Sequence, residues 1–261
     1  MTPAVGGAAA LAMLAVLIAR DVLDQAALRH SNDEVGNYIQ ALGAIYAVLA
    51  AFVVYAVWTQ LNEARLQCDR EANELIDLSR VFEGFPEQCR RRLQVKLATY
   101  VDTVIHVEWP AMAKHIEAAS MENGGLLDDI WSELHSAPVE TECQRSLHAE
   151  ALTRFNDLSD ARTARLSAAR ARIPLSLSLL LYFGGLSLVG SMLLVAIESL
   201  WIHALTTASL ASAVAHLLYV VADLDDAFAG DWQVSREPFE RAQRFIAKRA
   251  REPAAAPSIA A

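Results

Sequence analysis

The stretch VGNYIQALGAIYAVLAAFVVYAVW at residues 35–58 decides the fold of this chain, because it contains no Lys, Arg, Asp or Glu. A helix needs about 20 mostly apolar residues to span a bilayer. Residues 2–18, 173–197 and 200–221 are comparably apolar and also lack these charged residues. A helix on the surface of a soluble protein has a polar face, which these stretches lack. The sequence therefore predicts an all-α polytopic membrane protein with four transmembrane helices.

The charged residues of the chain concentrate between the second and third apolar stretches, at residues 59–172. Charges of both signs mixed along a helical sequence are typical of a solvated surface. We therefore expect a water-exposed helical domain inserted between spans 2 and 3. The net charge of −9 argues against nucleic acid as a partner, because binding phosphates requires clustered positive charge.

These patterns predict five segments along the chain. Residues 1–58 form transmembrane helices 1 and 2, and residues 173–222 form transmembrane helices 3 and 4. Residues 59–172 form the helical domain, which continues the helices of spans 2 and 3. Residues 223–251 form an acidic turn and a basic helix, and the Pro/Ala-rich residues 252–261 form a disordered tail.

The distribution of positive charge predicts the orientation in the membrane. Arginines gather at residues 162–172, before the third span, and Arg and Lys recur at residues 236–251, after the fourth. The loops on the opposite side carry few cations. Because cytoplasmic loops of membrane proteins are enriched in Lys and Arg, we place both termini and the central domain in the cytoplasm, at a bacterial inner membrane.

The positions of Pro and Gly predict the helices of the central domain. After Gly43 neither residue occurs before position 84, so one helix should cover residues 35–82, a length of roughly 70 Å. A second helix should cover about residues 86–117, with a kink at Pro110. The sequence Asn-Gly-Gly at residues 123–125 predicts a turn.

The second span is expected to present two different faces. One carries amides followed by small residues, and the other carries bulky residues. If copies of this helix surrounded an axis, the small face could line a pore with an apolar section that gates by dewetting. The alternative is tight helix packing, with the two amides hydrogen-bonded across an interface. The residues of the small face are Asn37, Gln40, Ala44, Ala47, Ala51 and Val54.

Two acidic residues, Asp33 and Glu34, directly precede this face. They would lie at the outer mouth of such a pore. Rings of carboxylates at a pore favour cations over anions. The ion selectivity is left open at this point.

The fourth span carries polar residues within its apolar sequence, namely Thr206, Ser209 and His216. An ionisable residue inside a membrane span is a functional-site hypothesis by default. The alternative is a neutral histidine that is hydrogen-bonded to a neighbouring hydroxyl or carbonyl group.

The densest acidic cluster follows the fourth span directly and contains Asp223, Asp225, Asp226 and Asp231. Calcium prefers several oxygen ligands, so this turn is a candidate calcium site, although its spacing does not fit an EF-hand loop. The alternative is a solvated acidic turn that faces nearby basic residues. No other cofactor or metal site is indicated, since the Cys and His residues show no ligand spacing.

Signatures of enzymes are missing from the sequence. It contains no G-x-S-x-G motif, no Gly-rich phosphate loop and no H-E-x-x-H motif. We therefore expect that the protein is not an enzyme.

Three segments carry a resemblance to a known family: Asn32-Asp33 … Gly36 … Gly43 … Tyr46–Phe52 … Trp58 in span 2, Glu108-Trp109-Pro110 in the central domain, and Asp225-Asp226-Ala227-Phe228 … Gly230 after span 4. They resemble segments of the bestrophin-like group of bacterial membrane proteins, and the similarity in order and topology covers nearly the whole chain. In that group the third segment reads D-x-P-F-x-G, so Ala227 stands where proline is usual.

The resemblance implies the architecture of bestrophins, which are pentameric chloride-selective channels with four spans, a helical cytoplasmic domain and a calcium-binding acidic turn. It implies a homo-oligomer, pentameric and embedded in a lipid bilayer, that passes small inorganic ions along span 2. The alternative is a non-conducting, membrane-anchored scaffold or sensor whose residues 59–172 bind a cytoplasmic partner.

Overall fold

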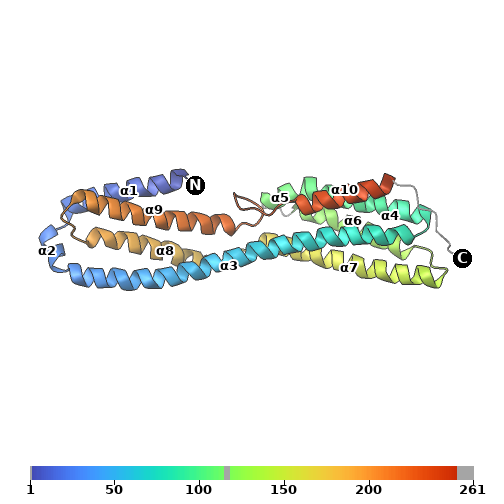
Figure 1. Cartoon of the computed structure of the whole chain (residues 1–261), viewed down its shortest axis with the longest axis horizontal. Coiled ribbons are helices and arrows are strands. Elements are labelled where there is room, and N and C mark those ends of the chain that lie inside the picture. The colour runs from blue at the N-terminus through green and yellow to red at the C-terminus, as the bar shows by residue number, and fades with distance from the viewer. Residues whose placement is uncertain (1, 115–117, 252–261) are drawn as a thin grey trace. The chain divides into compact units, whose positions relative to one another are not determined.

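The computed structural model describes residues 2–114 and 118–251, and the regular elements among them are all helices (Figure 1). Four helical stretches are long and apolar enough to cross a membrane: Pro3–Val22, Asn32–Gly84, Glu142–Leu194 and Leu200–Leu224. The predicted all-α class with four membrane-spanning helices is therefore confirmed. The predicted disordered tail, residues 252–261, lies outside the described residues.

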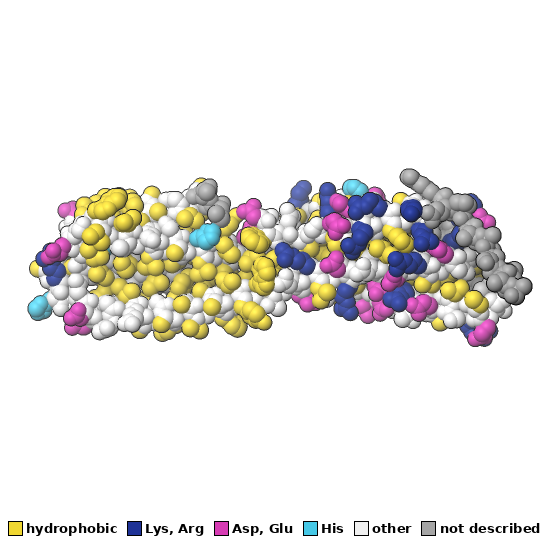
Figure 2. Space-filling view, viewed as in Figure 1, with side chains coloured by type: hydrophobic (Ala, Val, Ile, Leu, Met, Phe, Trp, Pro, Cys, Tyr) yellow, Lys and Arg dark blue, Asp and Glu magenta, His cyan; other side chains and the backbone are white. Residues whose placement is uncertain are grey.

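The chain forms two compact units. The first, here called the membrane unit, comprises Met1–Thr59 and Arg172–Asp225, and the second, the charged unit, comprises Gln60–Ala171 and Asp226–Ala261. Figure 2 shows many hydrophobic and few charged side chains on the membrane unit, and a mixture of Lys, Arg, Asp and Glu on the charged unit. The finer domain limits expected from the sequence stay predictions.

The helices of the membrane unit lie roughly along one direction (Figure 1). α3 is one unbroken helix of 50 residues, as the absence of Pro and Gly predicted, and its first part belongs to this unit. The elements are α1 (Thr2–Val22), α2 (Gln25–His30), the first part of α3 (Asn32–Val81), α8 (Leu175–Ser191), the 3-10 turn η3 (Met192–Leu194) and α9 (Leu200–Leu224).

Two glycines of α8 let it approach both α3 and α9 closely. A Cβ atom added to Gly184 would lie 2.8 Å from the ring of Tyr46. One added to Gly185 would lie 2.7 Å from Val214 Cγ1 and 2.9 Å from the Tyr46 hydroxyl. Small residues allow such contacts in membranes, where van der Waals packing drives helix association. The glycines therefore place α8 between α3 and α9.

The connection between α8 and α9 is held by side chains from the start of the chain. The amide of Asn32 accepts a hydrogen bond from Ala196 N–H (2.9 Å) and donates one to Ala196 O (3.1 Å). Arg20 donates to the carbonyls of Ile197 (3.0 Å) and Glu198 (2.9 Å). These bonds satisfy backbone groups that have no helical partner. The third span was expected to be helical over residues 173–197, but α8 is shorter because the chain leaves the helix for this connection.

The charged unit is a bundle around an apolar core. α4 lies against α6 and α10, and α6 also contacts α7 (Figure 1). The predicted basic C-terminal helix is present as α10. The elements are the rest of α3, the 3-10 turn η1 (Phe82–Gly84), α4 (Glu87–Thr103), the π-helical turn η2 (Val104–Glu108), α5 (Trp109–Ala113), α6 (Ala118–His135), α7 (Glu142–Arg170) and α10 (Glu237–Arg251).

The structure corrects one prediction for the charged unit and adds detail to another. Residues 123–125 are helical within α6 rather than a turn. Glycine costs a helix only about 1 kcal/mol per residue, and burial of Ile130 and Leu134 further along α6 offsets that cost. At the expected kink, the chain forms the π-helical turn η2, in which the Trp109 amide bonds to the Val104 carbonyl, five residues back. Such a turn accommodates the missing N–H group of Pro110.

Candidate functional site

Within the membrane unit, α3 buries only a narrow stripe of side chains. Val53 and Val57 are fully buried, and Tyr46 and Ala50 are nearly so. These residues recur at spacings of three and four, so they form one helix face that packs inside the chain. Most of the remaining surface of α3 in this unit is exposed, and the rest is half-buried.

The small face predicted from the sequence lies on this open surface. Asn37, Gln40, Ala44, Ala47 and Ala51 are exposed, and Val54 is half-buried. The structure therefore does not use this face for packing within one chain. Two roles remain for this face: it lines a pore, or it contacts another copy of the chain. Its assignment to a pore stays a prediction.

A second open face of α3 differs from the small one in the size of its side chains. It carries Tyr38, Ile45, Val48, Phe52 and Tyr55, which are between 55% and 73% exposed. Asp33 and Glu34 are exposed in the first turn of α3, where carboxylates also interact favourably with the helix dipole. The helix thus offers a polar-to-small surface beside a bulky apolar one.

The polar residues predicted on the fourth span lie on the outside of α9. Thr206, Ser209 and His216 are all exposed. The Thr206 hydroxyl donates to the Ile202 carbonyl (2.9 Å), whereas no hydrogen bond joins the His216 ring to another described residue. The buried histidine is His203, whose Nε2 lies 2.9 Å from Met192 O. Sequence reasoning missed it because a single histidine one turn into a helix gives no periodic signal.

Two carboxylates of the acidic turn bind backbone amides. Asp225 Oδ1 accepts a hydrogen bond from Ile173 N–H (2.8 Å), and Asp226 Oδ1 accepts one from Phe228 N–H (3.3 Å). Asp223 is half-buried and Asp231 is exposed. Among residues 2–114 and 118–251, no group of three His, Cys, Asp or Glu side chains is placed to hold a metal ion. The calcium site stays a prediction.

In the charged unit, Trp109 of the Glu-Trp-Pro segment packs against the segment that follows the acidic turn. Its ring meets that of Phe228 edge-on, with 5.2 Å between centroids, and that of Phe239 at 5.7 Å. Gly230 has a φ of 84°, which glycine adopts without strain, and so completes the turn that returns the chain to this contact. Two segments more than 100 residues apart therefore form one core.

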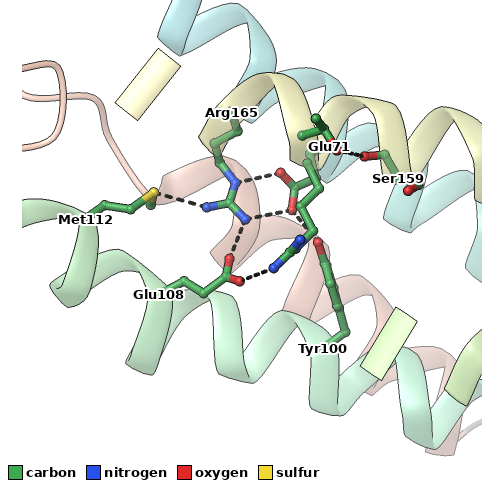
Figure 3. Close-up of polar contacts among 8 residues, drawn as sticks. Glu71, Tyr100, Glu108, Met112, Ser159 and Arg165 are labelled. Carbon is green, nitrogen blue, oxygen red and sulfur yellow. Dashed lines mark hydrogen bonds and ion pairs between the residues drawn. The ribbon is translucent and has the colours of Figure 1, made fainter. Parts of the chain in front are cut away.

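Glu108, beside this tryptophan, belongs to a buried cluster of charges (Figure 3). Its carboxylate pairs with Arg162 (2.9 Å) and with Arg165. Arg165 also binds Glu71, with 2.6 Å between Nε and Oε2 and 3.1 Å between Nη2 and Oε1. The Tyr100 hydroxyl donates to Glu71 (2.7 Å). The side chains of Arg165, Glu71 and Glu108 are fully buried.

The charges of this cluster balance, and their ionised forms stabilise one another. Burial alone would raise the pKa of Glu108, but the guanidinium groups of Arg165 and Arg162 outweigh it and hold the pKa below its usual range. Burial and the Glu71 carboxylate raise the pKa of Tyr100 well above 10.0, so this hydroxyl stays protonated. Because the charged groups bind one another, the cluster joins α3, α4, η2 and α7 rather than offering a ligand site.

Comparisons with known proteins place the fold. The sequence profile of the Bestrophin-like domain matches residues 6–239. A crystal structure of a point variant of a bacterial bestrophin homologue from Klebsiella pneumoniae superposes with a TM-score of 0.74 at 12% identity, over 95% of this chain and 99% of that one. A further structure of a bestrophin homologue from that organism gives 0.71 at 14% identity, over 94% and 98%.

A third crystal structure, that of a point variant of a membrane protein, gives a TM-score of 0.73 at 13% identity and covers 95% of this chain and 99% of its own. A comparison with functionally curated proteins found no match. At these identities the structural likeness shows the fold, and the profile match over most of the chain shows the family. This chain belongs to the Bestrophin-like family.

Proposed function

We propose that this protein is a homo-oligomeric ion channel in which the small face of α3 lines the pore. Its family, whose members are ion channels, supports this function. The observation that carries the proposal is the open small face itself. Asn37, Gln40, Ala44, Ala47 and Ala51 form a polar-to-small surface on a membrane-spanning helix, and none of the residues that the structure describes buries it.

Self-association is supported by the polar groups on the outside of the membrane unit. Amide, hydroxyl and imidazole groups that face hydrocarbon cost free energy, so they seek water or another helix. Asn37 and Gln40 on α3, and Ser209 and His216 on α9, are exposed on the single chain. In a ring of copies around a central axis, polar groups that face the pore would contact water. Polar groups that face a neighbouring copy would contact its helices. A pentamer is the arrangement we propose.

The proposed pore has an outer mouth and an apolar section. Asp33, Glu34, Asn37 and Gln40 would surround the mouth, and the exposed alanines Ala47 and Ala51 would form the apolar section. We further propose that the protein lies in a bacterial inner membrane with both termini and the charged unit in the cytoplasm. The excess of Arg and Lys before span 3 and after span 4 supports this orientation.

A tryptophan scan of two adjacent residues tests the pore assignment. Ala47→Trp should reduce conductance in planar bilayers by more than about tenfold, because a large ring fills the narrow section. Val48→Trp, one residue further on the bulky face, should leave conductance nearly unchanged. Both variants should assemble like the wild type in size-exclusion chromatography with light scattering. Equal conductance of Ala47→Trp and wild type removes the small face from the ion path, and a wild type without flux supports the scaffold instead.

The charge of the mouth is tested by ion selectivity. Asp33→Asn combined with Glu34→Gln should shift the reversal potential in a salt gradient towards lower cation preference, because carboxylates favour cations. Asp21→Asn, which removes an exposed carboxylate at the end of α1, is the control. A shift of equal size in the control would show a general surface-charge effect rather than a ring at the mouth.

A further inference from the structure

A polar groove lies between α3 and α7 in the charged unit, and its lining does not include the residues of the buried charge cluster. Its volume is about 380 Å³. Its polar lining consists of Gln67, Arg70 and Glu74 from α3 and Asp157 and Asp160 from α7, and two alanines of α7 complete it. No step of the proposed conduction uses this groove.

The charge of the groove favours a cation. Three carboxylates face one guanidinium group, a formal charge of −2. Glu74 is paired with Arg154 at 3.4 Å. Asp157, Asp160 and Arg70 make no hydrogen bond or ion pair with any other residue that the structure describes. Two aspartates are therefore available to a positively charged ligand.

Gln67 supplies a second, independent observation. This side chain is only 6% exposed, and its Nε2 donates a hydrogen bond to Glu63. A carboxylate only accepts hydrogen bonds, so this contact fixes which end of the amide is nitrogen. The other end, Oε1, is buried and finds no donor among the described residues. A buried acceptor without a donor is rare in folded proteins and indicates a missing partner.

We infer that this groove binds a cation that carries N–H donors, that is, a guanidinium or ammonium group. The net charge selects a cation, and the orphan oxygen of Gln67 requires a donor. A directly ligated metal ion fits less well, because no three His, Cys, Asp or Glu side chains in the described part of the chain are placed to hold one. Charge-assisted hydrogen bonds to Asp157 and Asp160 would orient the group.

Such a group can come from two sources, a free small cation or an Arg or Lys side chain of a second copy of this chain. The second source rests on the self-association proposed above, whereas the first does not. Binding of a free cation can therefore fail while the channel proposal stands, and the reverse also holds.

Calorimetric titration of the full-length protein in detergent with methylguanidinium, at low ionic strength, tests the free cation. Wild type should give saturable binding, and Asp157→Asn combined with Asp160→Asn should weaken it by at least about tenfold. Gln67→Met should weaken binding by a similar factor without lowering the Tm of the unliganded protein, because it removes an unsatisfied acceptor. Asp128→Asn combined with Asp129→Asn removes the same charge from the exposed face of α6 and should bind like wild type.

Light scattering of the same variants tests the second copy as the source. If a neighbour's side chain fills the groove, wild type shows no calorimetric binding, and the Asp157/Asp160 variant shifts to smaller assemblies while the Asp128/Asp129 control does not. Either result supports the inference. It is overturned if wild type shows neither saturable binding nor any change of assembly on Asp157/Asp160 substitution. It is also overturned if the α6 control changes as much as the groove variant.

Discussion

The two units of this chain place their polar groups in opposite ways. In the charged unit, Glu71, Glu108 and Arg165 are fully buried and bind one another, and the surface is a mixture of charges. In the membrane unit, Asn37 and His216 lie on the outside, and the interior is mostly apolar side chains and glycines. Its buried polar side chains, such as His203 and Thr207, bond to backbone carbonyls rather than to buried ions. The charged unit satisfies its buried ions internally. The membrane unit leaves polar groups exposed, which supports the proposal that further copies of the chain cover them.

The largest effect should follow from breaking the buried cluster. Arg165→Met leaves the carboxylates of Glu71 and Glu108 buried without their central partner, which should cost about 3–5 kcal/mol of stability. Thermal unfolding measures the loss, and labelling of buried Cys68 by maleimide should become faster. Adding Glu71→Gln and Glu108→Gln should restore part of the stability. A Tm within a degree of wild type for Arg165→Met would contradict the view that this unit depends on internal ion pairs.

A smaller effect is expected from filling the interior of the membrane unit. Gly185→Ala should destabilise by about 1–3 kcal/mol, because the new methyl group would overlap Val214 and the Tyr46 hydroxyl. Gly190→Ala is the matched control on the same helix, since nothing lies within 4 Å of its added Cβ. The control should be neutral or slightly stabilising, because alanine favours a helix. Thermal unfolding in detergent compares the two variants. Equal Tm values would show that the stability of the membrane unit does not depend on the close approach of α8 at Gly185.

The smallest effect is a dependence on acid that should be confined to the charged unit. The pKa of Glu108 lies below 4.5 in the folded state, so its ion pairs contribute stability above that pH. The contribution is lost as the pH falls below 4.5 and through the folded-state pKa, by about 1.4 kcal/mol per unit of pKa difference. The fluorescence of Trp109, followed during an acid titration, measures this loss of stability. If the stability of the charged unit rose on acidification, the pKa of Glu108 would not be lowered by its ion pairs, and the prediction would be wrong.

The features predictable from the sequence were those that follow from composition along one helix. The four spans follow from the absence of charge over about 20 residues, and the length of α3 follows from the absence of Pro and Gly after Gly43. The prediction of a turn at residues 123–125 was wrong because tertiary contacts elsewhere on α6 outweigh the weak helix preference of glycine.

The buried cluster was missed because its members are distant in sequence, yet one signal was present. Arg165 continues the 3–4 spacing of Ala151, Phe155 and Leu158, which are buried on α7, so it occupies a core position. A charged residue at a core position requires a buried partner of opposite charge. Periodicity could therefore have indicated that Arg165 is buried. It could not have identified Glu71 or Glu108 as its partners, because their pairing depends on how α3 and η2 pack.

The bonds from Arg20 and Asn32 to the connection between α8 and α9 have a consequence for how the protein is made. These side chains precede the backbone groups that they hold by more than 160 residues. Synthesis delivers the N-terminus first, and domains generally begin to fold in that order. Arg20 and Asn32 are therefore synthesised long before α8 and α9. When the last two spans enter the bilayer, the side chains that bind their connection are already in place.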